Sequence, residues 1–194
     1  MPFHNEAAQQ LLQIIDRHLS AARPLTLAID GCSAAGKTSL ARHLQAKYGC
    51  PVFHTDDYFL QPHQRTPQRL SQPGGNMDRE RFLQEVLLPL SQGKDVFCRR
   101  FDCGTMTLQP PVRVPYEPFQ VIEGTYCMHP DLAPYYTCSV FLRIAPEAQH
   151  ARILCRCPAE KAQQFFDRWI PLEQLYFQQL HPEKHCSLVW DVRP

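Results

Sequence analysis

The residues best suited to chemistry form the segment GCSAAGKT, from Gly31 to Thr38, which fits the pattern Gly-x-x-x-x-Gly-Lys-Ser/Thr at every defined position. In such a loop, small residues let successive backbone N–H groups surround phosphate oxygens, and the following helix adds positive potential. Lys37 is expected to reach the outer phosphates and the Thr38 hydroxyl to bind Mg²⁺. The predicted triphosphate contacts are Gly31, Ser33, Ala34, Ala35, Gly36, Lys37, Thr38 and Ser39.

Two adjacent carboxylates, Asp56 and Asp57, follow a short apolar run in the segment HTDDYF. Ligands of open α/β sheets bind at the carboxyl ends of the strands, so this pair is expected near the phosphate loop. Successive strand residues point to opposite faces, so at most one of the two can point at a transferred phosphoryl group. We predict that Asp56 is the base that accepts a proton from an attacking hydroxyl, and that it contributes to the metal site. Asp57 either binds substrate or caps the next turn.

Three further charged residues could complete such a site. Glu123 ends the apolar run at 119–122, where phosphate-loop proteins commonly carry an acid that organises the metal. The alternative is that Glu123 is an acid at the exposed end of a strand, without a role in metal binding. Arg152 and Arg156 are four residues apart and therefore share a helix face. Two guanidinium groups so placed could clamp phosphates, and a solvated basic face is the alternative.

The elements that must position these residues alternate between strand and helix patterns. Strands are predicted near 25–29, 52–53, 119–122, 140–144 and 188–190, and helices near 5–19 (with Asn5 as its cap), 37–48, 78–90, 146–156 and from 159 to a break at Pro171. Pro171 can also sit in the first turn of a new helix that runs to about 179. The segments 96–97 and 112–114 predict a small antiparallel pair, whereas 61–77 predicts a loop with a mobile turn at 74–75. This order favours a three-layer α/β sandwich around a mainly parallel sheet of about five strands.

Composition limits the partners and the compartment. A chain of 194 residues with a formal net charge of +1 and 44% hydrophobic residues fits one globular domain, without a surface for nucleic acid or acidic membranes. The nine cysteines include no Cys-x-x-Cys pair, so free thiols in a reducing cytosol are expected. No signal-peptide pattern or apolar run near 18 residues occurs, which favours a cytoplasmic protein. Whether the protein forms a homo-oligomer stays open.

Six segments occur in an order that resembles the uridine kinase family, a group of P-loop kinases related to phosphoribulokinase and bacterial pantothenate kinase: AIDGCSAAGKTSLA, HTDDYF, PGGNMDRERF, FDCGTMTL, VIEG and ARILCR. The resemblance covers residues 24–192 and implies a P-loop NTPase-like domain, with a substrate-side β element at 95–116 and a lid at 152–168. It also implies transfer of the γ-phosphoryl group of ATP, bound with Mg²⁺, to the 5′-hydroxyl of uridine or cytidine. By this resemblance the catalytic aspartate is Asp56, the acid near the metal Glu123, the lid arginines Arg152 and Arg156, and the substrate contacts Tyr58 or Phe59 and Asp78.

The chain departs from that family where the pyrimidine base is recognised. The family commonly has a tyrosine and a histidine there, whereas this loop offers Phe101, which could stack on a base but cannot donate a hydrogen bond. The alternatives are therefore a kinase for another small alcohol, such as a vitamin precursor or a sugar, and a nucleotide-binding regulatory ATPase. The guanine-binding pattern Asn-Lys-x-Asp is absent, but the choice between ATP and GTP stays open.

Overall fold

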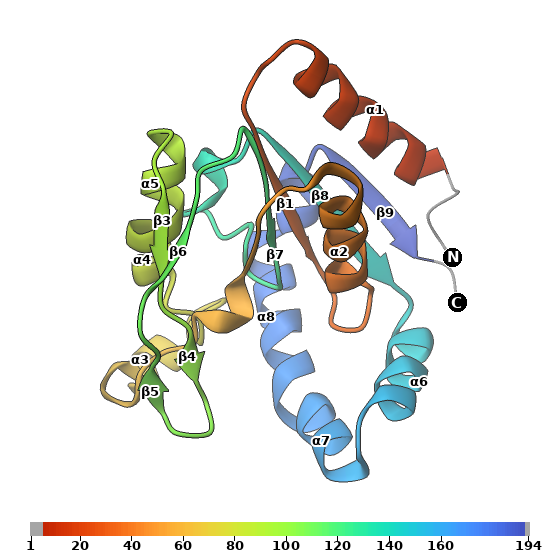
Figure 1. Ribbon diagram of the computed structural model, residues 1–194. Helices are drawn as coiled ribbons and strands as arrows, with labels where there is room; N and C mark the ends of the chain where they lie inside the picture. Colours follow the sequence, from red (N-terminus) through yellow and green to blue (C-terminus); the bar gives the residue numbers. More distant parts are fainter. Residues whose placement is uncertain (1–5, 193–194) are drawn as a thin grey trace.

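A five-stranded parallel sheet forms the centre of the computed structural model, which describes residues 6–192 (Figure 1). The strands lie in the order β2-β7-β1-β8-β9 and are β1 (Leu25–Gly31), β2 (Val52–His54), β7 (Phe119–Glu123), β8 (Cys138–Ile144) and β9 (Leu188–Val192). Neighbouring strands pair in parallel throughout, and every residue of β7 is buried. The predicted α/β fold with five parallel strands is confirmed.

Helices cover both faces of this sheet. On one face lie α1 (Glu6–Ser20) and α2 (Lys37–Tyr48), and the other carries α4 (Arg79–Phe82), α5 (Leu88–Ser91) and α8 (Ile170–Leu180). Two further helices, α6 (Pro146–Arg156) and α7 (Ala159–Gln164), lie beyond the carboxyl ends of the strands. The predicted cap of α1, Asn5, lies outside the described residues.

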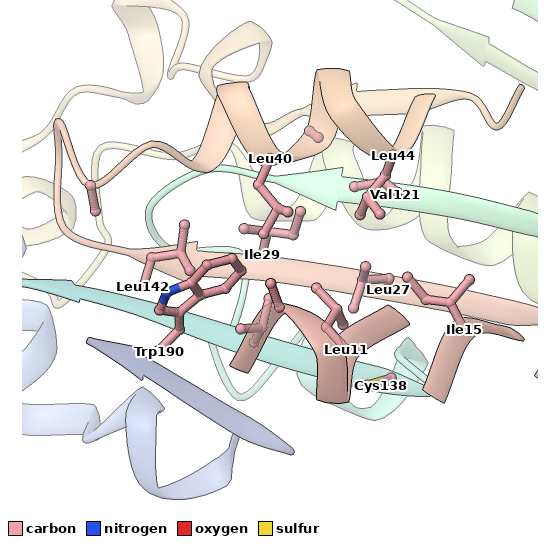
Figure 2. Packing of buried hydrophobic residues seen from close by; sticks show 14 of the residues in the cluster. Leu11, Ile15, Leu27, Ile29, Leu40, Leu44, Val121, Cys138, Leu142 and Trp190 are labelled. Carbon is pink, nitrogen blue, oxygen red and sulfur yellow. The ribbon is translucent and has the colours of Figure 1, made fainter. Parts of the chain in front are cut away.

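The larger part of the core packs α1 and α2 against the sheet (Figure 2). The side chains drawn there come from both helices and from four strands, and include Leu11, Ile15, Leu27, Ile29, Leu40, Leu44, Val121, Leu142 and Trp190. Full burial of one such aliphatic side chain stabilises a fold by about 1.5–3 kcal/mol. Because this packing holds β1 and α2 together, it also fixes the loop that joins them.

The segment between β2 and β7 contains more structure than the sequence predicts. The antiparallel pair of β3 (Val96–Cys98) and β6 (Val112–Val114) is present, but the connection between them forms a second pair, β4 (Phe101–Asp102) with β5 (Thr107–Leu108). The predicted loop at 61–77 holds the 3-10 helix η2 (Pro62–Gln64) and the short helix α3 (Pro67–Leu70). Its turn at Gly74 and Gly75 is buried, because the Tyr126 side chain packs against Gly74 and the backbone of the preceding residues packs against Gly75.

Pro171 lies in the first turn of a helix that ends at Leu180, as predicted, but the chain does not leave the helical conformation before it. A π turn, η5 (Phe165–Trp169), continues α7 directly into α8, which contains Pro171. The same arrangement occurs before Pro89, where η3 (Leu83–Leu87) joins α4 to α5. Proline lacks the N–H that would bond to the residue four positions earlier, and a wider turn just before it accommodates that loss without ending the helix.

Two expectations from composition can be compared with the structure. Within residues 6–192, no helix has the length and apolar character needed to cross a membrane. All nine cysteines are free thiols, and five of them are partly buried or exposed: Cys98, Cys103, Cys155, Cys157 and Cys186.

Candidate active site

The phosphate loop joins the end of β1 to the start of α2 and depends on two glycines. Gly31 has a φ of 132°, and a Cβ there would lie 2.1 Å from the Leu142 carbonyl oxygen of the neighbouring strand. Gly36, at the N-cap of α2, has a φ of 100°. Side chains rarely tolerate these conformations, so the two glycines are what allow the turn to be made.

Lys37 lies across the mouth of its own loop. Its Nζ donates hydrogen bonds to the carbonyl oxygens of Gly31 and Cys32, at 2.9 and 3.0 Å, and to the hydroxyl of Thr125, at 3.1 Å. Thr125 in turn donates to the Gly31 carbonyl at 3.1 Å. The ammonium group is thus held next to the loop, where an incoming phosphate would exchange these carbonyl contacts for stronger ones to anionic oxygens.

Thr38 and Glu123 meet directly, although they are 85 residues apart in the chain. The Thr38 hydroxyl donates to Glu123 Oε1 at 3.0 Å, and His54 Nδ1 donates to the same oxygen at 2.6 Å. Burial alone would raise the pKa of Glu123, but the hydrogen bond from His54 and the charge of Lys37 more than offset it and lower this pKa. Chiefly through that same hydrogen bond, the pKa of His54 is raised. Glu123 is therefore held as a carboxylate beside the phosphate loop.

These oxygens fit Mg²⁺, which prefers carboxylate and hydroxyl oxygens and keeps several positions for water and phosphate. Among residues 6–192, no three histidine, cysteine or acidic side chains cluster in a way that could hold a metal by themselves. An ion at Thr38 and Glu123 would therefore share its remaining ligands with a nucleotide and with water.

Asp56 lies in the 3-10 turn η1 (Thr55–Asp57), not in a strand, so the predicted strand alternation of the two aspartates does not apply. The turn nevertheless separates them. Asp56 lines the cavity next to the phosphate loop, whereas Asp57 accepts a hydrogen bond from Arg100 Nε at 2.8 Å. The side chain of Asp56 is open to the cavity, yet enough protein surrounds it that desolvation raises its pKa, despite the opposing charge of Lys37.

One cavity of about 760 Å³ collects most of these side chains. Of the predicted site residues it is lined by Ser33, Ala34, Gly36, Lys37, Thr38, Ser39, Asp56, Phe59, Glu123, Arg152 and Arg156. Gly31 forms the base of the loop, and Ala35 is buried in the core with α2. Both arginines of the predicted lid reach the wall, where Arg152 Nη1 donates to the Ala34 carbonyl at 3.3 Å and the Arg156 guanidinium lies 5.2 Å from the Phe165 ring centroid.

Three predicted substrate residues lie away from that wall. Tyr58 is buried in the core, with its ring edge against Phe82. Asp78 is buried too, because it caps α4 and pairs with Arg81 at 3.0 Å. Phe101 is buried in β4. These side chains are therefore occupied in packing or in a salt bridge, and of the predicted aromatic residues only Phe59 lines the cavity.

Glu173 on α8 is a site residue that sequence reasoning missed. Its carboxylate accepts hydrogen bonds from the backbone N–H of Ser33, at 3.1 Å, and from the Ser33 hydroxyl. Burial raises the pKa of Glu173, although Lys37 and Ser33 oppose that effect. The two residues are 140 positions apart, and no local pattern near Glu173 indicates the contact.

The other cavity residues that sequence reasoning missed are Asn76, Cys103, Thr125, Tyr126, Cys155, Lys161, Gln164, Phe165 and Trp169. Asn76 belongs to the segment PGGNMD, so its position two residues before Asp78 was a usable signal. Trp169 lies 5.9 Å from Phe59 between ring centroids, and its helical spacing favoured a role in the core instead.

No protein-family model matches the sequence. No curated protein matches it either. Among solved structures, a possible uridine kinase from Bacillus stearothermophilus has a TM-score of 0.65 at 22% identity, over 94% of this chain and 100% of that one. A provisionally named fructose transport system kinase from Silicibacter sp. TM1040 gives 0.61 at 22%, over 93% and 97%. A D-glycerate 3-kinase from Cryptococcus neoformans var. grubii gives 0.62 at 13%, over 97% and 96%. At these identities the likeness shows the fold alone, an α/β fold that this chain shares with all three structures.

Proposed function

We propose that this protein is an ATP-dependent small-molecule kinase that phosphorylates an alcohol, with the 5′-hydroxyl of uridine or cytidine as the preferred acceptor. The observation that carries the proposal is the convergence of Lys37, Thr38, Glu123 and Asp56 on one cavity. A phosphate loop alone serves switches and motors as well as kinases, but a carboxylate that lines the same cavity as that loop suits deprotonation of a hydroxyl.

In the proposed reaction the phosphate loop and Lys37 hold the triphosphate, and Arg152 and Arg156 lie at the same wall to balance its charge. Thr38 and Glu123 would hold Mg²⁺, which supplies further neutralisation of the phosphates. Asp56 accepts the proton of the acceptor hydroxyl while the hydroxyl oxygen forms a bond to the γ-phosphorus. The bond from that phosphorus to the β–γ bridging oxygen breaks, and ADP leaves.

The raised pKa of Asp56 agrees with this role, because a base with a higher pKa holds the proton more readily. The choice of uridine or cytidine as acceptor is supported by the sequence resemblance and by the similar fold of a possible uridine kinase. The similar folds of a fructose transport system kinase and a glycerate kinase leave other alcohols as alternative acceptors. A regulatory ATPase is the second candidate class.

Coupled detection of ADP separates these readings. With ATP and Mg²⁺, the rate is expected to rise at least tenfold above the ATP-only rate when uridine or cytidine is added, and a phosphorylated nucleoside should form in equal amount. Stimulation by another alcohol alone would keep the kinase and replace the acceptor. Hydrolysis that no acceptor alters would favour the ATPase instead.

A further inference from the structure

Thr125 contacts the phosphate loop from outside it. The residue lies two positions after the end of β7, is 7% exposed, and lines the cavity together with Lys37. Its hydroxyl donates to the Gly31 carbonyl and accepts from Lys37 Nζ, each at 3.1 Å. Because the hydroxyl has a single hydrogen, the bond to Gly31 fixes the direction in which its lone pairs face the ammonium group.

The three partners of the Lys37 ammonium group differ in how they are connected to it. Gly31 and Cys32 accept through carbonyls of the same loop, six and five residues earlier in the chain. Thr125 is 88 residues away and follows β7, the strand that pairs with β1. The two carbonyls therefore place Nζ relative to its own loop, whereas the Thr125 hydroxyl places it relative to the neighbouring strand.

Thr125 is also tied to the turn that carries the proposed base. The Thr55 hydroxyl donates to the Thr125 carbonyl at 3.2 Å, and Thr55 directly precedes Asp56 in η1. Gly124 makes this close approach possible, because it has a φ of 140° and a Cβ there would lie 1.9 Å from Thr55 Oγ1. Thr125 thus contacts Lys37 through its side chain and the turn of Asp56 through its backbone.

We propose that Thr125 is a positioning residue for phosphoryl transfer, whose hydroxyl keeps one hydrogen of the Lys37 ammonium group while the other two turn from the loop carbonyls to the nucleotide. The lysine charge is then held at a set place relative to Asp56, where it balances charge on the phosphoryl group as the acceptor oxygen attacks. The inference rests on the proposed kinase function and adds a residue that acts through Lys37.

Loss of the hydroxyl should reduce turnover more than nucleotide affinity. Thr125→Val keeps the size and branching of the side chain and is expected to lower kcat about tenfold in the coupled ADP assay, as the loss of one hydrogen bond to a charged group would. The Kd of Mg-ATP, from isothermal titration, should change less than about threefold, because the ammonium group still reaches the phosphates. Thr125→Ser restores the hydroxyl and should recover most of kcat.

Thr137→Val is the matched control. The Thr137 hydroxyl accepts a hydrogen bond from the Thr26 backbone N–H at 3.2 Å, near the start of β1, whereas the phosphate loop follows the end of that strand. This variant also loses a threonine hydroxyl contact and should keep the wild-type kcat. A wild-type kcat in Thr125→Val, or a loss that Thr125→Ser does not recover, would overturn the proposal.

Unfolding in urea tests the contact without turnover. If Thr125 acts through Lys37, Thr125→Val should lower the unfolding midpoint more in the wild-type chain than in a Lys37→Met chain, which lacks the partner. Equal shifts in both chains would show that the hydroxyl serves Gly31 alone, and would overturn the proposal. If no alcohol stimulates turnover, the kinase function fails, and the urea comparison together with the rate of ATP hydrolysis still decides the role of Thr125.

Discussion

Glu173 and Ser33 connect α8 to the phosphate loop, because the Glu173 carboxylate accepts a hydrogen bond from the Ser33 backbone N–H at 3.1 Å. Gln149 closes the contact from the other side by donating to the Ser33 carbonyl at 3.0 Å. A buried acid therefore lies against the loop that must receive a highly charged anion, and burial raises its pKa.

Glu173→Gln should tighten the binding of ATP by about five- to tenfold, because the amide keeps an acceptor for Ser33 and removes a negative charge near the phosphates. Isothermal titration with Mg-ATP measures the change. Glu160→Gln, which removes one charge from an exposed position in α7, should change the affinity less than twofold. Weaker binding in Glu173→Gln would mean that the carboxylate keeps the loop in shape.

Asp56→Asn should reduce kcat by about 10²–10⁴ and leave the Kd of ATP nearly unchanged, because a general base contributes about that much to the rate. The neighbour provides a matched control. Asp57→Asn removes an ion pair with Arg100 outside the cavity and should alter kcat less than threefold. The coupled ADP assay decides the matter, and comparable losses in both variants would remove Asp56 from its assigned role.

The pH dependence of kcat/KM should show an acidic limb that belongs to Asp56. The base must be deprotonated, so the rate falls as pH decreases through its pKa, and desolvation places that pKa above the ordinary value of 3.8. The limb should be absent from the residual activity of Asp56→Asn. An unchanged limb in that variant would assign it to another group, with Glu173 as the next candidate.

His54→Ala should raise the Mg²⁺ concentration needed for half-maximal activity by about 10- to 100-fold, the usual effect of losing a partner that orients a metal-binding carboxylate. The variant removes the 2.6 Å hydrogen bond to Glu123. His63→Ala, on the exposed turn η2, is the control and should keep the wild-type Mg²⁺ requirement. If both variants needed the same Mg²⁺ concentration, His54 would contribute to packing and not to the metal site.

Lys37→Ala should weaken the binding of ATP and nearly abolish turnover, because no other lysine contacts the phosphate loop in the described part of the chain. Lys47→Ala, on the same helix but exposed, controls for the loss of charge. Normal activity of Lys37→Ala in the coupled assay would contradict the assignment of the loop.

The sequence predicted best where a local pattern determines local geometry. The phosphate loop requires glycines at Gly31 and Gly36 because of their backbone angles, so its motif and its structure coincide. Glu123 is the last residue of the buried strand β7 and Asp56 follows β2 by two residues, and parallel strands bring their carboxyl ends to one edge of the sheet. That rule was enough to predict that these residues lie near one another.

The direction of several side chains depends on tertiary packing, which the sequence alone does not determine. Tyr58 and Phe59 are equally aromatic, and the 3-10 turn η1 decides which of them is buried and which reaches the cavity. Asp78 is used by Arg81, a partner that the sequence does not distinguish from any other arginine. Glu173 finds Ser33 only because α8 crosses the sheet beneath the phosphate loop, a relationship with no local signal.

The helix α8 is fastened to the sheet one turn beyond Glu173 as well, where the Tyr176 hydroxyl donates to the fully buried carboxyl of Asp30 at 2.7 Å. The contacts of Glu173 with Ser33 and of Tyr176 with Asp30 hold α8 to the phosphate loop and to the sheet. If the predicted lid moves over a bound nucleotide, its hinge next to α8 is expected in the π turn η5 (Phe165–Trp169). Amide hydrogens of α8 should consequently exchange far more slowly than those of α7, and equal exchange rates would show that α8 moves together with α7.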